Sequence, residues 1–307
     1  MPDGKPDRES GLWDVGLGYT PEICFSGACT QMQRKYIAGI CHGSAVGYLP
    51  GFLISMPTAL AIVQSDCGFA LAADSFHCGL DGHVVSEKVQ KIFPLSLPNS
   101  HLAYCLCGTA THSGIQDSGQ SDLLFDYALE VPRLLATITE LATLYQTVDA
   151  LGRRIRRKLR KAISGVQTSN PGSTYIWFVG YYRGGWPELM VEEIRTTAVK
   201  GQIEHIVHRV EAKYNLIEGC FPGAVRQQFY SDALFAPFRT VDSSYAGIAM
   251  AVEVARQAVA ACYDPGVRER YPECQVVGGK IHSAQVTRDE GFKWICLPDS
   301  YEQQGPI

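Results

Sequence analysis

The sequence lacks an excess of basic charge, a long uninterrupted apolar run, internal repeats and low-complexity tracts. The formal net charge of its 307 residues is −4, so composition gives no case for nucleic acid as a partner. The best candidate for a membrane span, residues 37–56, is interrupted by four glycines, His42 and Pro50. We therefore expect no membrane contact. A hydrophobic content of 46% and a charged content of 19% indicate an ordinary globular chain.

A disulfide framework is also missing. The eleven cysteines are an odd number and are scattered. Several of them, including Cys67, Cys105 and Cys107, fall in expected core strands, where reduced thiols act as small apolar groups. This usage predicts a cytoplasmic protein. The potential metal ligands near the N-terminus lack a second closely spaced cysteine pair, so we predict neither a metal nor any other cofactor. These potential ligands are Cys24, Cys29, Cys41 and His42.

What the chain does contain is a pair of apolar runs around a short turn. Residues 58–63 (TALAIV) and 69–75 (FALAADS) flank a glycine-bearing turn at 65–68, which predicts a β-hairpin. Both faces of each run are apolar, so we expect the hairpin to be buried on both sides. A turn centred near Asp66 places Thr58 opposite or nearly opposite Asp74. The hydroxyl group of Thr58, at the start of the first strand, then faces the carboxylate of Asp74, at the end of the second strand.

Two further polar positions follow. Lys91 opens the next apolar run in Gln-Lys-Ile, and Gly108 closes the one after it in Cys-Gly-Thr-Ala. Together with Thr-Ala-Leu-Ala-Ile-Val and Gly-Phe-Ala-Leu-Ala-Ala-Asp-Ser, these motifs resemble the N-terminal half of a proteasome β-type subunit, which belongs to the N-terminal-nucleophile hydrolases. The interval of sixteen residues from Thr58 to Asp74 is that of the family. The loops before Lys91 and Gly108 are slightly longer than the corresponding loops of that family.

The resemblance implies a fold and a reaction. The fold is α+β, a four-layer αββα sandwich with two mostly antiparallel sheets between helical layers, which suits the order of expected strands and helices. The reaction is peptide hydrolysis by a threonine-type endopeptidase. It implies Thr58 as nucleophile, Lys91 and Asp74 as its support, and Gly108 as oxyanion donor. The implied partners are a peptide or unfolded protein and other copies in a homo-oligomeric ring, with no nucleic acid and no membrane.

The resemblance is looser in the rest of the chain, which it covers to about Trp294. Asp264 matches a further catalytic aspartate, and Gly278-Gly279 matches part of a Ser-Gly-Gly motif, with Val277 in place of the serine. Cys220 stands in a loop that usually supplies another serine. At both positions the hydroxyl group with which the family supports its catalytic residues is therefore missing or unplaced.

Alternatives remain open because the nucleophile must become the first residue of the mature chain. The residue before it is Pro57, where self-cleaving members generally have glycine, and proline makes a tertiary amide. One alternative is a non-catalytic, ring-forming structural subunit. Another is an amidohydrolase of the same superfamily that cleaves a small amide.

Hydrophobic periodicity predicts the remaining elements. Residues 120–162 are expected to be helical, with a break or kink near Glu130 caused by Pro132. In the basic run 153–161 we expect a solvated helix face, with an apolar stripe pointing inward (Leu151, Ile155, Leu159). Strands are predicted at 174–182, 188–195 and 203–210. A second long helix is expected from Asp242 to Cys262, capped by Asp242 or Ser243, with Met250, Val254 and Ala258 on one face.

The expected domain organisation has three parts. Residues 1–57 are an N-terminal extension, which we expect to be poorly ordered. It is either a propeptide or a segment assigned in error to a chain whose translation begins at Met56. Residues 58–297 form the hydrolase-like domain. Residues 298–307 form a C-terminal tail.

Overall fold

The computed structural model describes residues 58–78, 84–115, 121–138, 141–164, 167–168, 172–196, 202–210, 217–218, 228–229, 231–239 and 247–298. They fall within one compact unit, Leu53–Ile307. The predictions made for residues 1–57, for the tail from residue 299 on, for Cys220 and for caps at Asp242 or Ser243 lie outside the described residues.

The first sheet is built around the predicted hairpin and has the antiparallel order β13-β1-β2-β14-β15. All residues of β1 and β2 are buried, so the prediction of a hairpin buried on both sides is confirmed. The bounds are β1 Leu60–Ser65, β2 Gly68–Ala73, β13 Ile217–Glu218, β14 His282–Thr287 and β15 Gly291–Cys296.

The hairpin register differs by one residue from the expected one. Leu60 pairs with Ala73, and the Asp74 N–H donates to the Ala59 carbonyl oxygen at 3.1 Å. Asp74 therefore lies opposite Ala59, next to Thr58. The reason is that the turn consists of two residues, Asp66 and Cys67, so its centre lies between them and not on Asp66.

The second sheet has the antiparallel order β12-β11-β10-β6-β5. Its bounds are β5 Ile92–Leu97, β6 Ser100–Gly108, β10 Gly172–Tyr181, β11 Pro187–Thr196 and β12 Ile203–Val210. The strands predicted at 174–182, 188–195 and 203–210 are thus confirmed. Two small antiparallel sheets add β3 His77–Cys78 with β4 Val84–Ser86, and β8 Ser121–Asp126 with β7 Thr111–Ile115 and β9 Gln167–Thr168.

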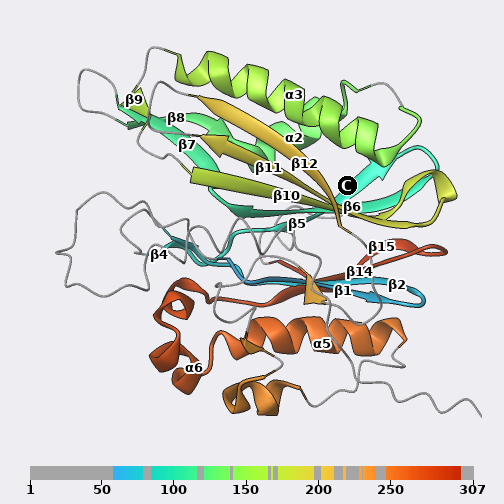
Figure 1. Cartoon of the computed structure of the whole chain (residues 1–307), viewed down its shortest axis with the longest axis vertical. Helices are drawn as coiled ribbons and strands as arrows, with labels where there is room; N and C mark the ends of the chain where they lie inside the picture. Colours follow the sequence, from blue (N-terminus) through green and yellow to red (C-terminus); the bar gives the residue numbers. More distant parts are fainter. Residues whose placement is uncertain are drawn as a thin grey trace, which may run out of the picture. The chain divides into compact units, whose positions relative to one another are not determined.

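Helices pack on both sheets. Figure 1 shows α2 (Tyr127–Leu135) and α3 (Leu144–Ile163) over the β5–β12 sheet, and α5 (Ile248–Ala261) along β1 and β2. Short helices complete the described part: α6 Pro265–Arg270, η1 Tyr182–Gly184, η2 Ala233–Phe238 and η4 Pro272–Val276. The chain is therefore α+β with mainly antiparallel sheets. No helix of the described residues is long and apolar enough to cross a membrane.

Alternation along β1 and β2 explains how one hairpin serves two cores. Successive strand residues point to opposite faces. Ala59, Ala61 and Val63 belong to a cluster with α5, whereas Leu60 and Ile62 belong to a cluster with the second sheet. A third cluster joins the other face of the second sheet to α2 and α3. The hairpin that leads to Thr58 and Asp74 is thereby held from both sides.

Two helix predictions need correction. The segment 120–162 does not begin as a helix, because residues 121–126 pair with β7 as strand β8, and Asp126 then caps α2. Tertiary pairing thus overrides the apparent three- and four-residue spacing. Two helices do form, but Pro132 lies inside α2 and the break follows it.

The second long helix begins later than expected, at Ile248 after the N-cap Gly247. Its buried stripe includes Val254 and Ala258, but Met250 is 43% exposed. The expected inward stripe of α3 is confirmed, since Leu151, Ile155 and Leu159 are all fully buried.

Candidate functional site

The candidate site lies where the ends of several strands from both sheets come together, next to the polar residues singled out in the sequence. β1 and β2 are antiparallel, so the start of β1 and the end of β2 lie together, with Thr58 and Asp74 just beyond them. The start of β14 joins the same end, because His282 pairs with Ala73. On the second sheet, Lys91 immediately precedes β5 and Gly108 ends the antiparallel β6.

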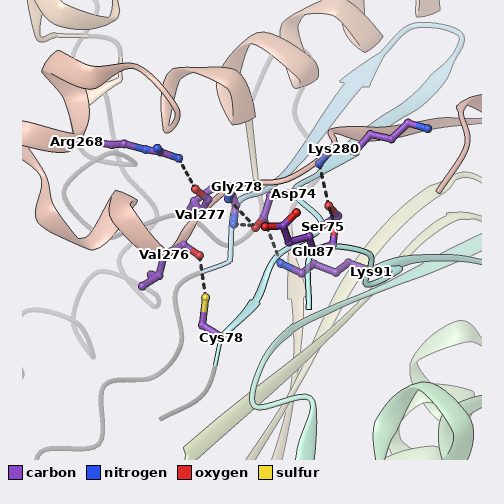
Figure 2. Close-up of polar contacts among 11 residues, drawn as sticks. Asp74, Ser75, Cys78, Glu87, Lys91, Arg268, Val276, Val277, Gly278 and Lys280 are labelled. Carbon is purple, nitrogen blue, oxygen red and sulfur yellow. Dashed lines mark hydrogen bonds and ion pairs between the residues drawn. The ribbon is translucent and has the colours of Figure 1, made fainter. Parts of the chain in front are cut away.

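The centre of the site is a buried ion pair. Lys91 Nζ lies 2.7 Å from Asp74 Oδ1, and the two side chains are 8% and 0% exposed. The pair is drawn in Figure 2. It joins the end of a strand in the first sheet to the beginning of a strand in the second. Removing both charges from water is costly, and their mutual attraction offsets that cost only while the two groups stay in close contact.

Backbone groups complete the surroundings of the Asp74 carboxylate. The Ala59 N–H donates to Oδ1 at 3.0 Å, and the Gly278 N–H donates to Oδ2 at 3.3 Å. Burial raises the pKa of Asp74, while the charge and hydrogen bond of Lys91, followed by these two N–H groups, oppose that rise. The site thus supplies three donors to one fully buried carboxylate.

Thr58 lies beside this centre. It is 7% exposed and is the first described residue. The next residue, Ala59, donates to the same Asp74 oxygen that binds Lys91 Nζ. One carboxylate oxygen therefore connects the lysine cation to the backbone adjoining Thr58. The expected register placed Thr58 itself opposite Asp74, whereas the observed contact is made by the backbone of the next residue, Ala59.

Ser75 joins three segments behind the ion pair. Its fully buried hydroxyl donates to the Glu87 carbonyl oxygen at 2.5 Å and accepts from the Lys280 N–H at 2.8 Å. The Val89 N–H donates to the Ser75 carbonyl oxygen at 3.0 Å. These contacts, seen in part in Figure 2, fix the loop that delivers Lys91 and the segment that carries Gly278.

Gly108 adopts a conformation that favours glycine. Its φ is +83°, and a Cβ there would lie 2.1 Å from the Ser173 carbonyl oxygen. The Leu106 N–H donates to the Lys91 carbonyl oxygen at 2.9 Å, and Gly108 lies two residues further along β6. At about 3.4 Å per residue, Gly108 is about 7 Å along the strand from that pairing.

Asp264 has a different setting. It is the N-cap of α6, and its Oδ1 accepts from the Val267 N–H at 3.1 Å. The contacts found for its carboxylate tie it to the helix start and not to Asp74 or Lys91. Val277, which stands in place of the expected serine, is fully buried among apolar side chains. Gly278, beside it, reaches Asp74 through its backbone.

Comparison with known proteins corrects the family prediction. No family model matches the chain, and no curated protein does. Solved structures that the chain matches include "Anbu (ancestral beta-subunit) from Yersinia bercovieri", at 13% identity and a TM-score of 0.43, and "Anbu (Gly-1) mutant from Hyphomicrobium sp. strain MC1", at 15% identity and a TM-score of 0.42. The matches cover 80% of this chain in each case and 88% and 90% of those chains.

The prediction that this chain is a proteasome β-type subunit is therefore wrong. The four motifs that suggested it cover the β1–β2 hairpin, the start of β5 and the end of β6, so they indicate a local arrangement and do not define a family. The chemistry proposed below rests on that arrangement itself.

Sequence reasoning missed three groups near the ion pair. Ser75 was noted only as part of a motif, and Arg268 was not singled out. His77, in β3, is half-buried, and its pKa is lowered by burial and by the nearby charge of Lys91. The available signal was the position of Ser75 and His77 directly after Asp74. Arg268 is remote in sequence, and its contact with this region depends on the fold.

Proposed function

We propose that this chain is a threonine-type endopeptidase whose nucleophile is the hydroxyl of Thr58. The observation that carries the proposal is the buried Asp74–Lys91 pair, one oxygen of which is bound to the backbone next to Thr58. A buried ion pair is weak evidence for a stabilising role, because desolvation offsets its attraction. A lysine cation held on the carboxylate that also binds the backbone next to Thr58 is better accounted for by catalysis.

The reaction begins with processing between Pro57 and Thr58, which gives Thr58 a free α-amine with an ordinary pKa of about 8. The amine accepts the hydroxyl proton as Oγ forms a bond to the carbonyl carbon of the substrate. It then protonates the leaving nitrogen, the C–N bond breaks, and the acyl group remains on Oγ as an ester. Water attacks the ester, losing a proton to the amine, and restores the hydroxyl.

The neighbouring residues have separate roles in this scheme. The Lys91 cation disfavours protonation of the α-amine and stabilises developing negative charge, while Asp74 orients the lysine. The Gly108 N–H stabilises the oxyanion, a contribution of about 3 kcal/mol to the barrier. Asp264 supports the site indirectly, by capping the helix that leads toward Gly278.

Intact-mass measurement of the purified chain tests the processing step. We expect a mature chain that begins at Thr58, and labelling of Thr58 by an epoxyketone or a β-lactone. Thr58→Ala should abolish processing and labelling, whereas Thr58→Ser, which keeps a hydroxyl, should retain both at a reduced rate. A chain that retains Pro57 and has no peptidase activity would exclude the proposal.

A non-catalytic structural role is the second candidate. It is favoured by the buried apolar Val277, which cannot supply the hydroxyl expected at its position. It predicts no labelling of Thr58 and an assembly unchanged in Thr58→Ala. The small-amide alternative predicts instead that Thr58 is labelled and that acylated small molecules, and not peptides, are cleaved.

Several broader predictions belong to this proposal. The three hydrophobic clusters support a helix–sheet–sheet–helix layering, that is, the four-layer αββα sandwich. Residues 58–297 are proposed as its catalytic domain. Homo-oligomeric ring formation stays a prediction, which light scattering after gel filtration tests. A cytoplasmic location also stays a prediction, and no disulfide bond is assigned to the seven cysteines among the described residues.

A further inference from the structure

One peptide group connects the Asp74 carboxylate to a distant arginine. The Gly278 N–H donates to Asp74 Oδ2 at 3.3 Å. The carbonyl of the same peptide group belongs to Val277, and its oxygen accepts from Arg268 Nη2 at 2.6 Å. Figure 2 shows this row of contacts, from Arg268 through Val277 and Gly278 to Asp74 and Lys91. The arginine and the carboxylate thus bind opposite ends of one amide dipole.

Arg268 is itself fixed by a second carbonyl and by an aromatic ring. Its Nε donates to the Cys262 carbonyl oxygen at 3.2 Å, and its guanidinium carbon lies 5.6 Å from the centre of the Tyr263 ring. None of the acidic side chains among the described residues forms an ion pair with it. Its charge is directed at backbone carbonyls at the end of α5 and ahead of β14.

We infer that Arg268 is a positioning residue for the Asp74–Lys91 pair and acts through the Val277–Gly278 peptide group. As far as catalysis is concerned, this inference rests on the proposed function. A cation on the carbonyl oxygen draws electron density from the amide, which strengthens its N–H as a donor. It also holds the peptide plane so that the N–H points at the carboxylate.

Apart from Lys91, the ionisable groups that the structure describes around Asp74 carry no charge that would stabilise its carboxylate. Lys91 faces Asp74 from the start of β5, and Cys262 and Tyr263 lie within electrostatic range of it at the end of α5. The thiol and the phenol are neutral groups whose pKa values are raised, mainly by a thiol contact with Cys274 and by burial, respectively. The support of the Asp74 charge therefore comes from Lys91 and from the backbone donors at Ala59 and Gly278.

The test compares Arg268→Met and Arg268→Lys with the matched control Arg270→Met. Arg270 lies on the same helix, but it pairs with Asp232 at 3.3 Å, away from Val277. The measurement is the carboxyl ¹³C titration of Asp74 in chains labelled at aspartate, assigned with Asp74→Asn. We expect Arg268→Met to move the titration midpoint upward by roughly half to one pH unit. Arg268→Lys should give a smaller shift, and Arg270→Met none.

A second measurement concerns the reaction. If Thr58 is the nucleophile, Arg268→Met should lower kcat about three- to tenfold and shift the acidic limb of the pH–rate profile, with KM unchanged. An Asp74 midpoint in Arg268→Met equal to that of the parent chain would overturn the inference. If Arg268→Met fails to fold, Arg268→Gln, which also removes the charge, takes its place, and an unshifted Asp74 midpoint in that variant overturns the inference.

The two proposals fail separately. Absence of labelling and hydrolysis in the parent chain would exclude the threonine peptidase, whereas the titration of Asp74 would still decide the role of Arg268. Conversely, an active parent chain with an unchanged Asp74 titration in the variants would leave the peptidase intact and exclude the positioning role.

Discussion

Replacement of Glu192 by glutamine should stabilise the fold at neutral pH. Glu192 lies on β11, pairs with Ile176 and Val207 in the second sheet, and is fully buried under α3. Neither of its carboxylate oxygens has a hydrogen-bond partner among the residues that the structure describes. Gly152 of α3 packs directly over it, so closely that a Cβ there would lie 1.5 Å from Oε1. The carboxyl group is thus enclosed without a donor.

The sign of the pH effect follows from this enclosure. Burial, with a smaller contribution from the Asp149 charge, raises the pKa of Glu192 well above its ordinary value of 4.5. The folded chain therefore keeps a proton that the unfolded chain has lost, and stability falls as pH rises through the interval between the two pKa values. Within that interval the loss is about 1.4 kcal/mol for each pH unit. Glutamine, which does not titrate, avoids this loss.

Urea unfolding of the parent chain and of Glu192→Gln between pH 5 and pH 7.5 measures the difference. We expect the advantage of the variant to grow with pH and to level off above the pKa of the folded carboxyl. The exposed Glu204 of β12 provides the control Glu204→Gln, which should show no such trend. A stability difference that is independent of pH would refute the reasoning, because it would mean that Glu192 carries the same charge in the folded and unfolded chains.

Two further predictions concern the site and use the same unfolding assay. Lys91→Met should lower the free energy of unfolding by about 3–5 kcal/mol, because it leaves the Asp74 carboxylate buried without its cation. The double variant Lys91→Met/Asp74→Asn should recover part of this loss. Equal losses in the single and the double variant would argue against coupling between the two side chains. Gly108→Ala should destabilise more than Gly184→Ala. Both positions have positive φ, but a Cβ at Gly184 meets no atom within 4 Å, whereas one at Gly108 meets the Ser173 carbonyl oxygen at 2.1 Å. The control isolates the cost of a positive φ for alanine, about 1–2 kcal/mol. Equal losses of unfolding free energy in the two variants would mean that the strand relaxes around the added Cβ at Gly108.

The local pattern of the sequence was sufficient for the hairpin and for much of the second sheet. Runs such as residues 60–65 and 68–73 have no polar face, so burial on both sides follows from their composition. The same pattern placed Asp74 and Lys91 at strand ends, where a polar side chain can leave the core. The pattern could not decide the strand register to within one residue. Both runs are apolar on both faces, so a register shifted by one residue buries the same kinds of side chain.

Other features depended on contacts between remote segments. Residues 121–126 read as helical, yet they pair with β7, since hydrogen bonding to a neighbouring strand outweighs a short-range spacing. Four short motifs suggested a family that the comparisons do not bear out, because motifs within one hairpin and two neighbouring strands report a local geometry and not the whole chain.

By itself, the sequence determined that Thr58 and Lys91 precede apolar strands and that Asp74 and Gly108 lie where apolar strands end. Neighbouring residues carry that information. Only the tertiary structure decided that Lys91 and Asp74 form a buried pair, because they lie in different sheets. Only the structure brought Arg268 to the peptide group that binds Asp74, and enclosed Glu192 beneath Gly152. Such contacts depend on how helices pack against sheets, and no short stretch of sequence records that packing.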